Sequence, residues 1–324
     1  MPSREAPAVY YYTPDHDVPS WGIGMLHNHV RFLKRHGIRA FVLHDRYPFR
    51  ITWYEADVPR IYLDSGAFQP APNDILVVPE VVARRKRLRR FRCRRVVFVQ
   101  GSSIVTLGLG TEHTYPSLGY ESAMAVMPHI KTILERHFSI AAECVPPCIA
   151  PYVFASRRQL ENGRRKRRIV LFRKRGSDDY HTLARVLKDR LASASWELTE
   201  IRERSHREVA NIFRTSAFHV NVNSQESLNA TVAEAMAAGC VTVCYDAYGG
   251  LDYLKDGYNS YVMPNRHIFP LIDRILDLTG AYDDIQEELA EIRSNAFETA
   301  CCYTEAATEQ ALLKFFRRLL RTAP

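Results

Sequence analysis

The sequence predicts an α/β protein of two doubly wound domains, each a parallel sheet with helices packed on it. Short apolar runs of strand length alternate with helix-forming segments in both halves of the chain. The 324 residues correspond to about two domains of roughly 150 residues each. A polar segment rich in proline and arginine lies between the halves, which is typical of a hinge.

The composition is that of a soluble globular protein, with 46% hydrophobic and 25% charged residues. No run of about 18 apolar residues is present, so we expect no membrane-spanning helix. The first residues, Met1 to Glu5, form no apolar signal region. The seven cysteines are an odd number without secretion features, and they predict reduced thiols in the cytosol.

The first half opens with an apolar, aromatic strand at residues 8–12. A turn that contains Gly22 and Gly24 follows, and then a helix over residues 25–36 with an apolar stripe. This order of strand, glycine loop and helix is typical of a doubly wound domain. Further strands are predicted at residues 40–43, 61–63, 75–78, 96–99, 123–127 and 142–145, and a further helix at 128–137.

The second half restarts the alternation after a hinge at about residues 145–167. The predicted domains are residues 1–150 and 151–324, and the last helix either stays with the second domain or packs back on the first. Ser205 and Glu208 offer a capping box at one helix start. Strands are predicted at residues 168–172, 196–201, 218–222 and 241–245, and helices at 178–191, 205–214, 229–238, 268–278, 285–299 and 304–320.

The most informative stretch, from His219 to Asn259, predicts a strand, a polar turn, a helix and a second strand. Glu226 lies in the turn and Glu234 lies two turns into the helix, so the two carboxylates belong to different elements and can hold two parts of one long ligand. Free amides and the positive dipole end of the helix start favour a phosphate there. These positions are Ser227, Leu228, Asn229 and Ala230, with Thr231 next. The alternative is that Glu226 only complements the dipole and Glu234 is a surface residue.

This stretch resembles the Glu-x7-Glu motif of retaining glycosyltransferases with the GT-B fold, of the family-4 type. The resemblance includes Glu-Ala-Met-Ala-Ala-Gly-Cys-x-x-Val from Glu234, then Gly249-Gly250 and Lys255-Asp256-Gly257. It implies two Rossmann-like domains facing each other across a cleft. It also implies that Glu226 contacts the donor sugar and Glu234 contacts the nucleotide ribose. The second domain matches well, from about residue 169 to 263, and the first matches in outline.

Arg173 and Lys174 directly follow the predicted strand at 168–172, where a diphosphate would lie beyond the carboxyl end of the sheet. In the resembled family an Arg and a Lys stabilise the leaving nucleoside diphosphate, so no metal and no separate cofactor are expected. The resemblance also implies that the loop of Gly22 and Gly24 approaches the donor diphosphate. A solvated basic loop and a packing turn are the plainer alternatives.

The run from Arg84 to Arg95 holds nine Lys or Arg in twelve residues, in a chain of net charge +8. It is either a solvated helix face or a docking site for an anionic membrane surface. Nucleic acid is the least favoured partner, because only Phe91 interrupts the run as an aromatic residue and no nucleic-acid module is recognised. The lipid-linked acceptors of many relatives favour docking on the inner face of the membrane.

Together these features predict a metal-independent retaining glycosyltransferase. It would move a sugar from a nucleotide-diphosphate sugar to a glycan or lipid-linked acceptor, in cell-surface glycan or glycolipid synthesis. Two alternatives remain open. One is a GT-B enzyme of other chemistry, such as a nucleotide-sugar epimerase. The other is a binding module that uses the basic run while the site is idle.

Overall fold

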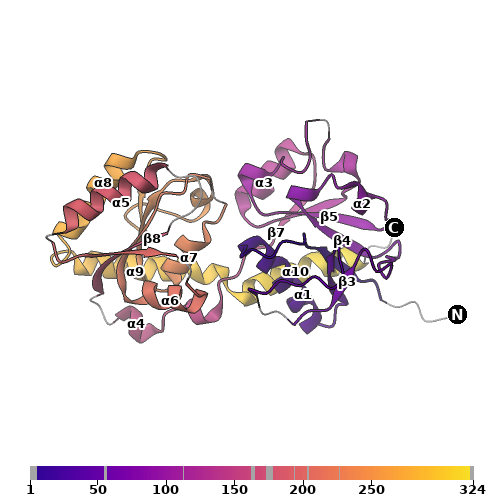
Figure 1. Cartoon of the computed structure of the whole chain (residues 1–324), viewed down its shortest axis with the longest axis horizontal. Helices are drawn as coiled ribbons and strands as arrows, with labels where there is room; N and C mark the ends of the chain where they lie inside the picture. Colours follow the sequence, from indigo (N-terminus) through magenta and orange to yellow (C-terminus); the bar gives the residue numbers. More distant parts are fainter. Residues whose placement is uncertain are drawn as a thin grey trace. The chain divides into compact units, whose positions relative to one another are not determined.

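The computed structural model describes residues 6–54, 57–111, 113–161, 165–172, 178–192, 194–202, 204–225 and 227–321 (Figure 1). Its contacts divide the chain into two compact units. Unit 1 comprises residues 1–148 and 306–324, and unit 2 comprises residues 149–305. Within the described ranges, no helix is both long enough and apolar enough to cross a bilayer.

Unit 1 is built on a seven-stranded parallel sheet with the order β3-β2-β1-β4-β5-β6-β7. Helices α1 (Trp21–Arg35) and α10 (Glu305–Arg321) pack on the face to which Tyr11 points, since its ring lies 5.5 Å from His29 and 6.2 Å from Phe316. Figure 1 shows α3 (Pro128–His137) on the opposite side. The strands are β1 (Val9–Tyr12), β2 (Ala40–His44), β3 (Arg60–Tyr62), β4 (Ile75–Pro79), β5 (Arg94–Val99), β6 (Ser122–Ala125) and β7 (Ala142–Cys144).

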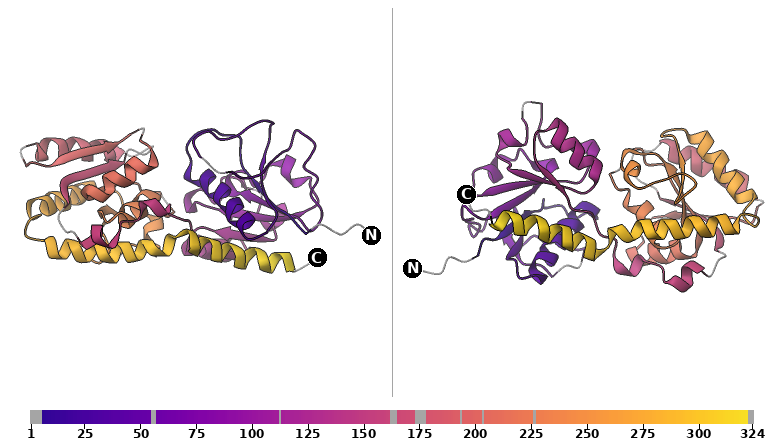
Figure 2. Two further views of the ribbon diagram at one scale, coloured as in Figure 1. Left: turned by 90° about the horizontal axis from the view of Figure 1, so that it is seen from below. Right: turned by 180° about the vertical axis from the view of Figure 1, so that it is seen from behind.

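Unit 2 is built on a five-stranded parallel sheet with the order β12-β11-β10-β8-β9. The strands are β8 (Lys166–Phe172), β9 (Glu197–Ile201), β10 (Ser216–Asn221), β11 (Val241–Tyr245) and β12 (Tyr261–Met263). Helices α5 (Asp178–Leu191) and α8 (Ile268–Gly280) pack together on one side of it. The other side carries α6 (His206–Thr215), α7 (Ala230–Ala237) and α9 (Gln286–Ala300), with the short α4 (Arg157–Glu161) against α9. Figure 2 shows these layers from two further sides.

The core of unit 2 explains why the inner strands of this sheet have continuous apolar sequences. Leu183 and Leu187 of α5 and the strand residues Phe218 and Val220 are at most 2% exposed and belong to one cluster. Trp196 stacks on Phe218 with ring centroids 5.6 Å apart. A parallel sheet buried on both faces has no solvent side, so its strands lose the alternation of apolar and polar residues.

Strand order reverses once in each sheet, and this fixes where ligands can bind. In unit 1 the chain moves outward from β1 to β2 and β3, and in the other direction from β4 onward. In unit 2 the reversal lies between β8 and β10. Connections leave toward opposite faces at such a point, which opens a crevice outside the carboxyl ends of the two strands.

The predicted fold class, two doubly wound α/β domains, is confirmed. Helices α3 and α5 have the predicted bounds. Pro128 occupies the first turn of α3, where its missing N–H costs nothing. The predicted capping box of α6 is formed in both directions between Ser205 and Glu208. Helix α7 ends at Ala237, and Gly239, with φ +74°, stops it just beyond the C-cap residue Ala238, as predicted. The amide of Cys240 donates to the carbonyl of Ala235, as in a Schellman motif.

Two local predictions are wrong. Helix α1 begins at Trp21 and not near residue 25, because the Ser20 hydroxyl caps it by accepting from the amide of Ile23. Gly22 and Gly24 therefore lie in the first turn of a helix and not in a loop. Strand β12 was not predicted, because its three residues sit at the sheet edge and only Tyr261 is fully buried.

Candidate functional site

The carboxyl ends of β8 and β10 border the crevice of unit 2, because the strand order reverses between these two strands. Residues 173–177 follow β8 and residues 222–229 follow β10, and these are the two strands at which the order reverses. Of the predicted residues there, Arg173, Lys174 and Glu226 lie outside the described residues. Residues 222–225 and 227–229, which follow β10, are among the described residues, and open α/β sheets bind ligands at the carboxyl edge where β10 ends.

The start of α7 is held by a side-chain network that the sequence did not predict. Asn229 occupies the residue before the helix with a left-handed backbone, φ 57° and ψ 73°. Its side-chain amide donates to Asn221 Oδ1 at 2.9 Å, and its Oδ1 accepts from Asn221 Nδ2 at 3.2 Å and from Thr231 Oγ1 at 3.0 Å. Asn221 is the last residue of β10, so the network fixes the helix start to the strand end.

The backbone around Asn229 suits an anion. The first amides to enter the helical ladder are those of Val232 and Ala233, which both donate to the carbonyl of Asn229. The amides of Ala230 and Thr231 precede that ladder and lie at the positive end of the helix dipole. Leu228 is 3% exposed, and its carbonyl accepts from the hydroxyl of Tyr253 at 2.6 Å. A backbone fixed in this way can receive a phosphate without reorganising.

Glu234 is buried, 6% exposed, and it is held by a histidine that the sequence analysis did not single out. His206, the first residue of α6, donates from Nε2 to Glu234 Oε1 at 2.7 Å. The hydroxyl of Tyr152 lies 2.6 Å from Nδ1 of the same ring. The bond to Glu234 raises the pKa of His206, because it favours the charged ring. The idea that Glu234 is a free surface residue is therefore wrong.

Gly22 and Gly24 belong to unit 1, whereas the other described donor-site candidates belong to unit 2. A Cβ at Gly22 would lie 2.4 Å from Oε1 of Gln100, which follows β5. A Cβ at Gly24 would make only ordinary contact, 3.6 Å, with the ring of Tyr54. Oε1 of Gln100 is the end of a flexible side chain that can move aside, so space does not strictly require a glycine at either position.

A second cluster, also missed, gathers at the carboxyl edge of unit 1. Tyr12 ends β1 and donates its hydroxyl to Asp45 Oδ2 at 2.6 Å, just beyond β2. Arg85 Nη2 lies 3.0 Å from that oxygen, and Arg87 Nη1 lies 3.6 Å from Asp45 Oδ1. Burial and the Asp45 bond raise the pKa of Tyr12, so the phenol stays protonated. The signal in the sequence is a polar side chain at the end of one buried strand, Tyr12, and another directly after the next, Asp45.

The basic run of residues 84–95 is divided between inward and outward side chains. Arg85 and Arg87 pair with Asp45. Arg94 pairs with Glu121 at 2.9 Å, and Arg95 donates to the carbonyls of Arg89 and Phe91. Lys86, Arg89 and Arg90 line, together with Arg95, a surface hollow of about 490 Å³.

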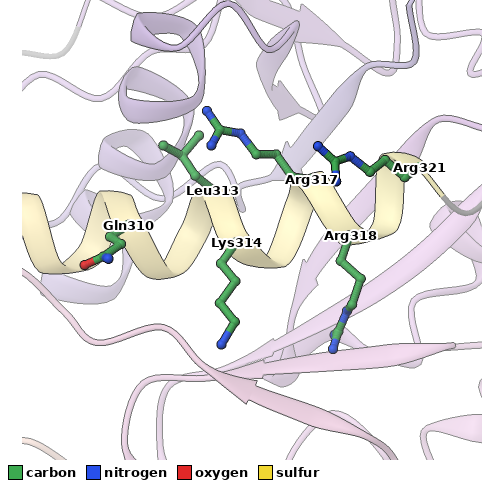
Figure 3. Close-up of a pocket in the computed structure, with 6 residues that line it drawn as sticks. All are labelled: Gln310, Leu313, Lys314, Arg317, Arg318 and Arg321. Atoms are coloured by element: carbon green, nitrogen blue, oxygen red, sulfur yellow. The ribbon is translucent and has the colours of Figure 1, made fainter.

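A second hollow of about 690 Å³ lies along α10, and Figure 3 shows the described side chains that line it. The lining residues are Gln310, Leu313, Lys314, Arg317, Arg318 and Arg321. All come from one helix, so this is an open cationic face. Neither hollow includes a predicted donor-site residue, and both have the chemistry of anion-binding surfaces.

No group of three or more His, Cys, Asp or Glu with metal-binding geometry occurs among the described residues. Asp15 instead accepts from the amides of Asp45 and Arg46, each at 3.0 Å, and Asp17 accepts from the amide of Thr52 at 2.8 Å. The seven cysteines are free thiols, and burial raises the pKa of Cys240 and Cys244 to about 12. These two are therefore inert, protonated core residues at neutral pH.

No family model and no curated protein matches the chain. Solved structures do match. A glycosyltransferase from Rickettsia africae ESF-5 aligns with a TM-score of 0.69 and 11% identity, over 98% of this chain and 100% of that one. The sucrose-phosphate synthase of Thermosynechococcus elongatus aligns at 0.71 and 11%, over 98% and 100%. Anabaena Alr3699/HepE, solved in complex with UDP, aligns at 0.67 and 11%, over 96% and 100%. With its two parallel α/β units, the chain has the GT-B glycosyltransferase fold.

Proposed function

We propose that the protein is a retaining glycosyltransferase of the family-4 type that moves a sugar from a nucleotide-diphosphate sugar to a glycan or lipid-linked acceptor. One observation carries the proposal: the Glu-x7-Glu spacing brackets a helix start at the point where the strand order of unit 2 reverses. The similarity to HepE, which binds UDP, supports the donor class. The odd number of cysteines without secretion features supports a cytosolic location.

Each predicted residue has a role in this reaction. The amides of Asn229 and Ala230 hold the diphosphate together with Arg173 and Lys174. Ser227, Leu228 and Thr231 complete the backbone around it, and the resemblance assigns Gly22 and Gly24 to donor binding as well. Glu226 holds hydroxyls of the donor sugar, and Glu234 holds the ribose. As the bond to the sugar breaks, negative charge grows on the diphosphate, and fixed donors and cations stabilise that charge without reorganising.

The first test is nucleotide binding. UDP, ADP and GDP are each added in a thermal-unfolding experiment, where a ligand at about 100 times its dissociation constant stabilises the native state by about 2.7 kcal/mol. We expect one nucleotide to raise the melting temperature in the presence of EDTA, because Arg173 and Lys174 replace a metal. No shift with any nucleotide would contradict the proposal.

The second test is transfer itself. Glu226→Ala is expected to lower the transfer rate about 100-fold or more, because one charge-assisted contact to the reacting sugar is worth about 3 kcal/mol. The control is Glu291→Ala, an exposed carboxylate on α9. Full activity of Glu226→Ala would remove the assignment. Conversion of the donor without any acceptor would identify an epimerase instead.

We further propose that the cationic hollow of Lys86, Arg89 and Arg90 docks on the anionic inner face of the membrane. Each cation near such a surface contributes about 1 kcal/mol. Replacing all three by alanine is then expected to weaken binding to vesicles with anionic phospholipid about 100-fold, with no effect on neutral vesicles. The control replaces Arg157 and Arg158 of α4, and equal effects of the two sets would contradict the docking site.

A further inference from the structure

Three side chains from three elements of unit 2 form a hydrogen-bonded chain that ends on Glu234. Tyr152 lies in the 3-10 helix Pro151–Val153, His206 begins α6, and Glu234 lies in α7. The Tyr152 hydroxyl is 2.6 Å from His206 Nδ1, and His206 Nε2 is 2.7 Å from Glu234 Oε1. The rings of Tyr152 and His206 also meet edge to face, with centroids 5.5 Å apart. These contacts fix the imidazole at both ends.

The direction of the chain follows from the chemistry of its last member. An ionised carboxylate only accepts hydrogen bonds, so Nε2 of His206 must carry a hydrogen. In the neutral ring Nδ1 then accepts from the Tyr152 hydroxyl, and in the charged ring it donates to that oxygen. The bond from His206 to Glu234 is the same in both states, so the carboxylate has a fixed donor whatever the charge of the ring.

The surroundings hold this relay in place. The capping box of Ser205 and Glu208 fixes the first turn of α6, which presents His206. The guanidinium of Arg207 lies 4.2 Å above the ring of Tyr152, and Arg214 donates to the carbonyl of Tyr152. Besides Glu234 itself, Arg207 is a charged group that acts on the relay. A side chain that merely filled space would need none of these contacts.

The relay leaves one oxygen of Glu234 for a ligand. His206 occupies Oε1, Oε2 makes no hydrogen bond within the described residues, and the Glu234 side chain is 8% exposed. We propose that His206, supported by Tyr152, is a positioning residue that fixes the Glu234 carboxylate so that it accepts hydrogen bonds from the ribose hydroxyls of the nucleotide. The proposal rests on the proposed function, in which Glu234 binds the ribose.

The test separates ribose recognition from general integrity of the site. Binding of UDP, ADP and GDP is measured by calorimetry beside the 2′,3′-dideoxy analogue of each, which lacks the hydroxyls that Glu234 would hold. The wild type should bind the best nucleotide about tenfold more tightly than its analogue, as expected for one charge-assisted contact. Glu234→Gln should weaken that preference. His206→Phe should also lose it, with the affinity for the analogue unchanged.

Two further variants complete the design. His206→Gln should keep most of the preference, because its side-chain amide can still donate to Glu234. His137→Phe, at the exposed end of α3 in unit 1, should behave as the wild type. If His206→Phe does not fold, Tyr152→Phe tests the positioning role in its place. Its affinity for the nucleotide should fall a few-fold, and its affinity for the dideoxy analogue should not change.

The outcomes distinguish two failures. If Glu234→Gln loses the preference and His206→Phe keeps it, the positioning role is wrong and the proposed function stands. If Glu234→Gln keeps the full preference, or if the wild type binds no nucleotide, the ribose assignment of the proposed function is wrong and the inference falls with it. Equal losses for nucleotide and analogue in the His206 and Tyr152 variants would assign the relay to folding alone.

Discussion

Replacing Glu80 by glutamine is expected to remove a pH dependence from the stability of unit 1. Glu80 directly follows β4 and is 1% exposed. Its Oε1 accepts from the amide of Gln100 at 2.9 Å and from that of Gly101 at 3.1 Å. Burial raises the pKa of Glu80 from 4.5 to about 7, although the two amides partly favour the charged form. The carboxyl group is therefore protonated in the folded protein over a range where the unfolded chain has lost its proton.

The sign and the size follow from that difference. The folded state holds a proton that the unfolded state releases, so the free energy of unfolding falls as the pH rises from 4.5 to about 7. The stabilising contribution is complete below pH 4.5 and lost above about 7. Each pKa unit is worth 1.36 kcal/mol, so a shift of about 2.5 units corresponds to roughly 3 kcal/mol.

The assay is urea unfolding at pH 5 and at pH 7.5, followed by tryptophan fluorescence. A Trp196→Phe background leaves Trp21 and Trp53, both in unit 1, as the reporters. The difference in unfolding free energy between the two pH values should be roughly 2.4 kcal/mol larger in the parent than in Glu80→Gln, which is less than the full shift because the unfolded carboxyl has already lost most of its proton at pH 5. Glutamine keeps the accepting oxygen, and the cost of its buried amide N–H does not depend on pH. Equal pH dependence in the two proteins would refute the reasoning.

Three further predictions concern unit 2. Arg293 is 1% exposed, its guanidinium has no hydrogen-bond partner among the described residues, and Arg165 lies near enough to lower its pKa further. Arg293→Met should therefore raise the unfolding free energy by about 1–4 kcal/mol in urea unfolding. Destabilisation would show that the charge finds an acceptor in solution. Gly239→Ala should cost about 1–2 kcal/mol in the same assay, because φ is +74° there and a Cβ would lie 2.9 Å from Arg165 Nη2; an unchanged midpoint would contradict the strain. Asn229→Gly keeps the left-handed backbone and removes the bonds to Asn221, so it should weaken nucleotide binding, and Asn229→Ala should cost about 1 kcal/mol more stability. Asn229→Ala and Asn229→Gly of equal stability would show that the backbone is not strained.

Local sequence signals predicted most of the fold. Ser205 and Glu208 predict the start of α6, and Pro128 predicts the start of α3, because capping and proline geometry act within one turn of a helix. Helix α1 was placed too late because Gly22 and Gly24 are weak helix formers, and the Ser20 cap outweighs them. Strand β12 was missed because three edge residues carry too little hydrophobic pattern.

Only the parts of the candidate site whose residues are close in sequence could be predicted. The spacing of Glu226 and Glu234 is a local motif. The partner of Glu234 is His206, 28 residues away, and the partner of Arg85 is Asp45, 40 residues away. Such pairs exist only after two helices or two strand ends have been brought together, so no periodicity or spacing along the chain reports them.

A count of charges along the sequence also misses the partners that the basic run of residues 84–95 finds elsewhere in unit 1. Nine cations occur from residue 84 to 95, but Arg85, Arg87, Arg94 and Arg95 are engaged by carboxylates or carbonyls of unit 1. An ion pair already formed inside the unit contributes little attraction to an outside surface, because the two charges cancel beyond roughly a Debye length. Asp45 and Glu121 supply two negative charges, so ion pairing cancels two of the nine cations, and Arg95, bound to carbonyls, keeps its charge. Arg317 and Arg321 of α10 line the second hollow. On an anionic surface that contacts both hollows, their charges would add to those of the basic run.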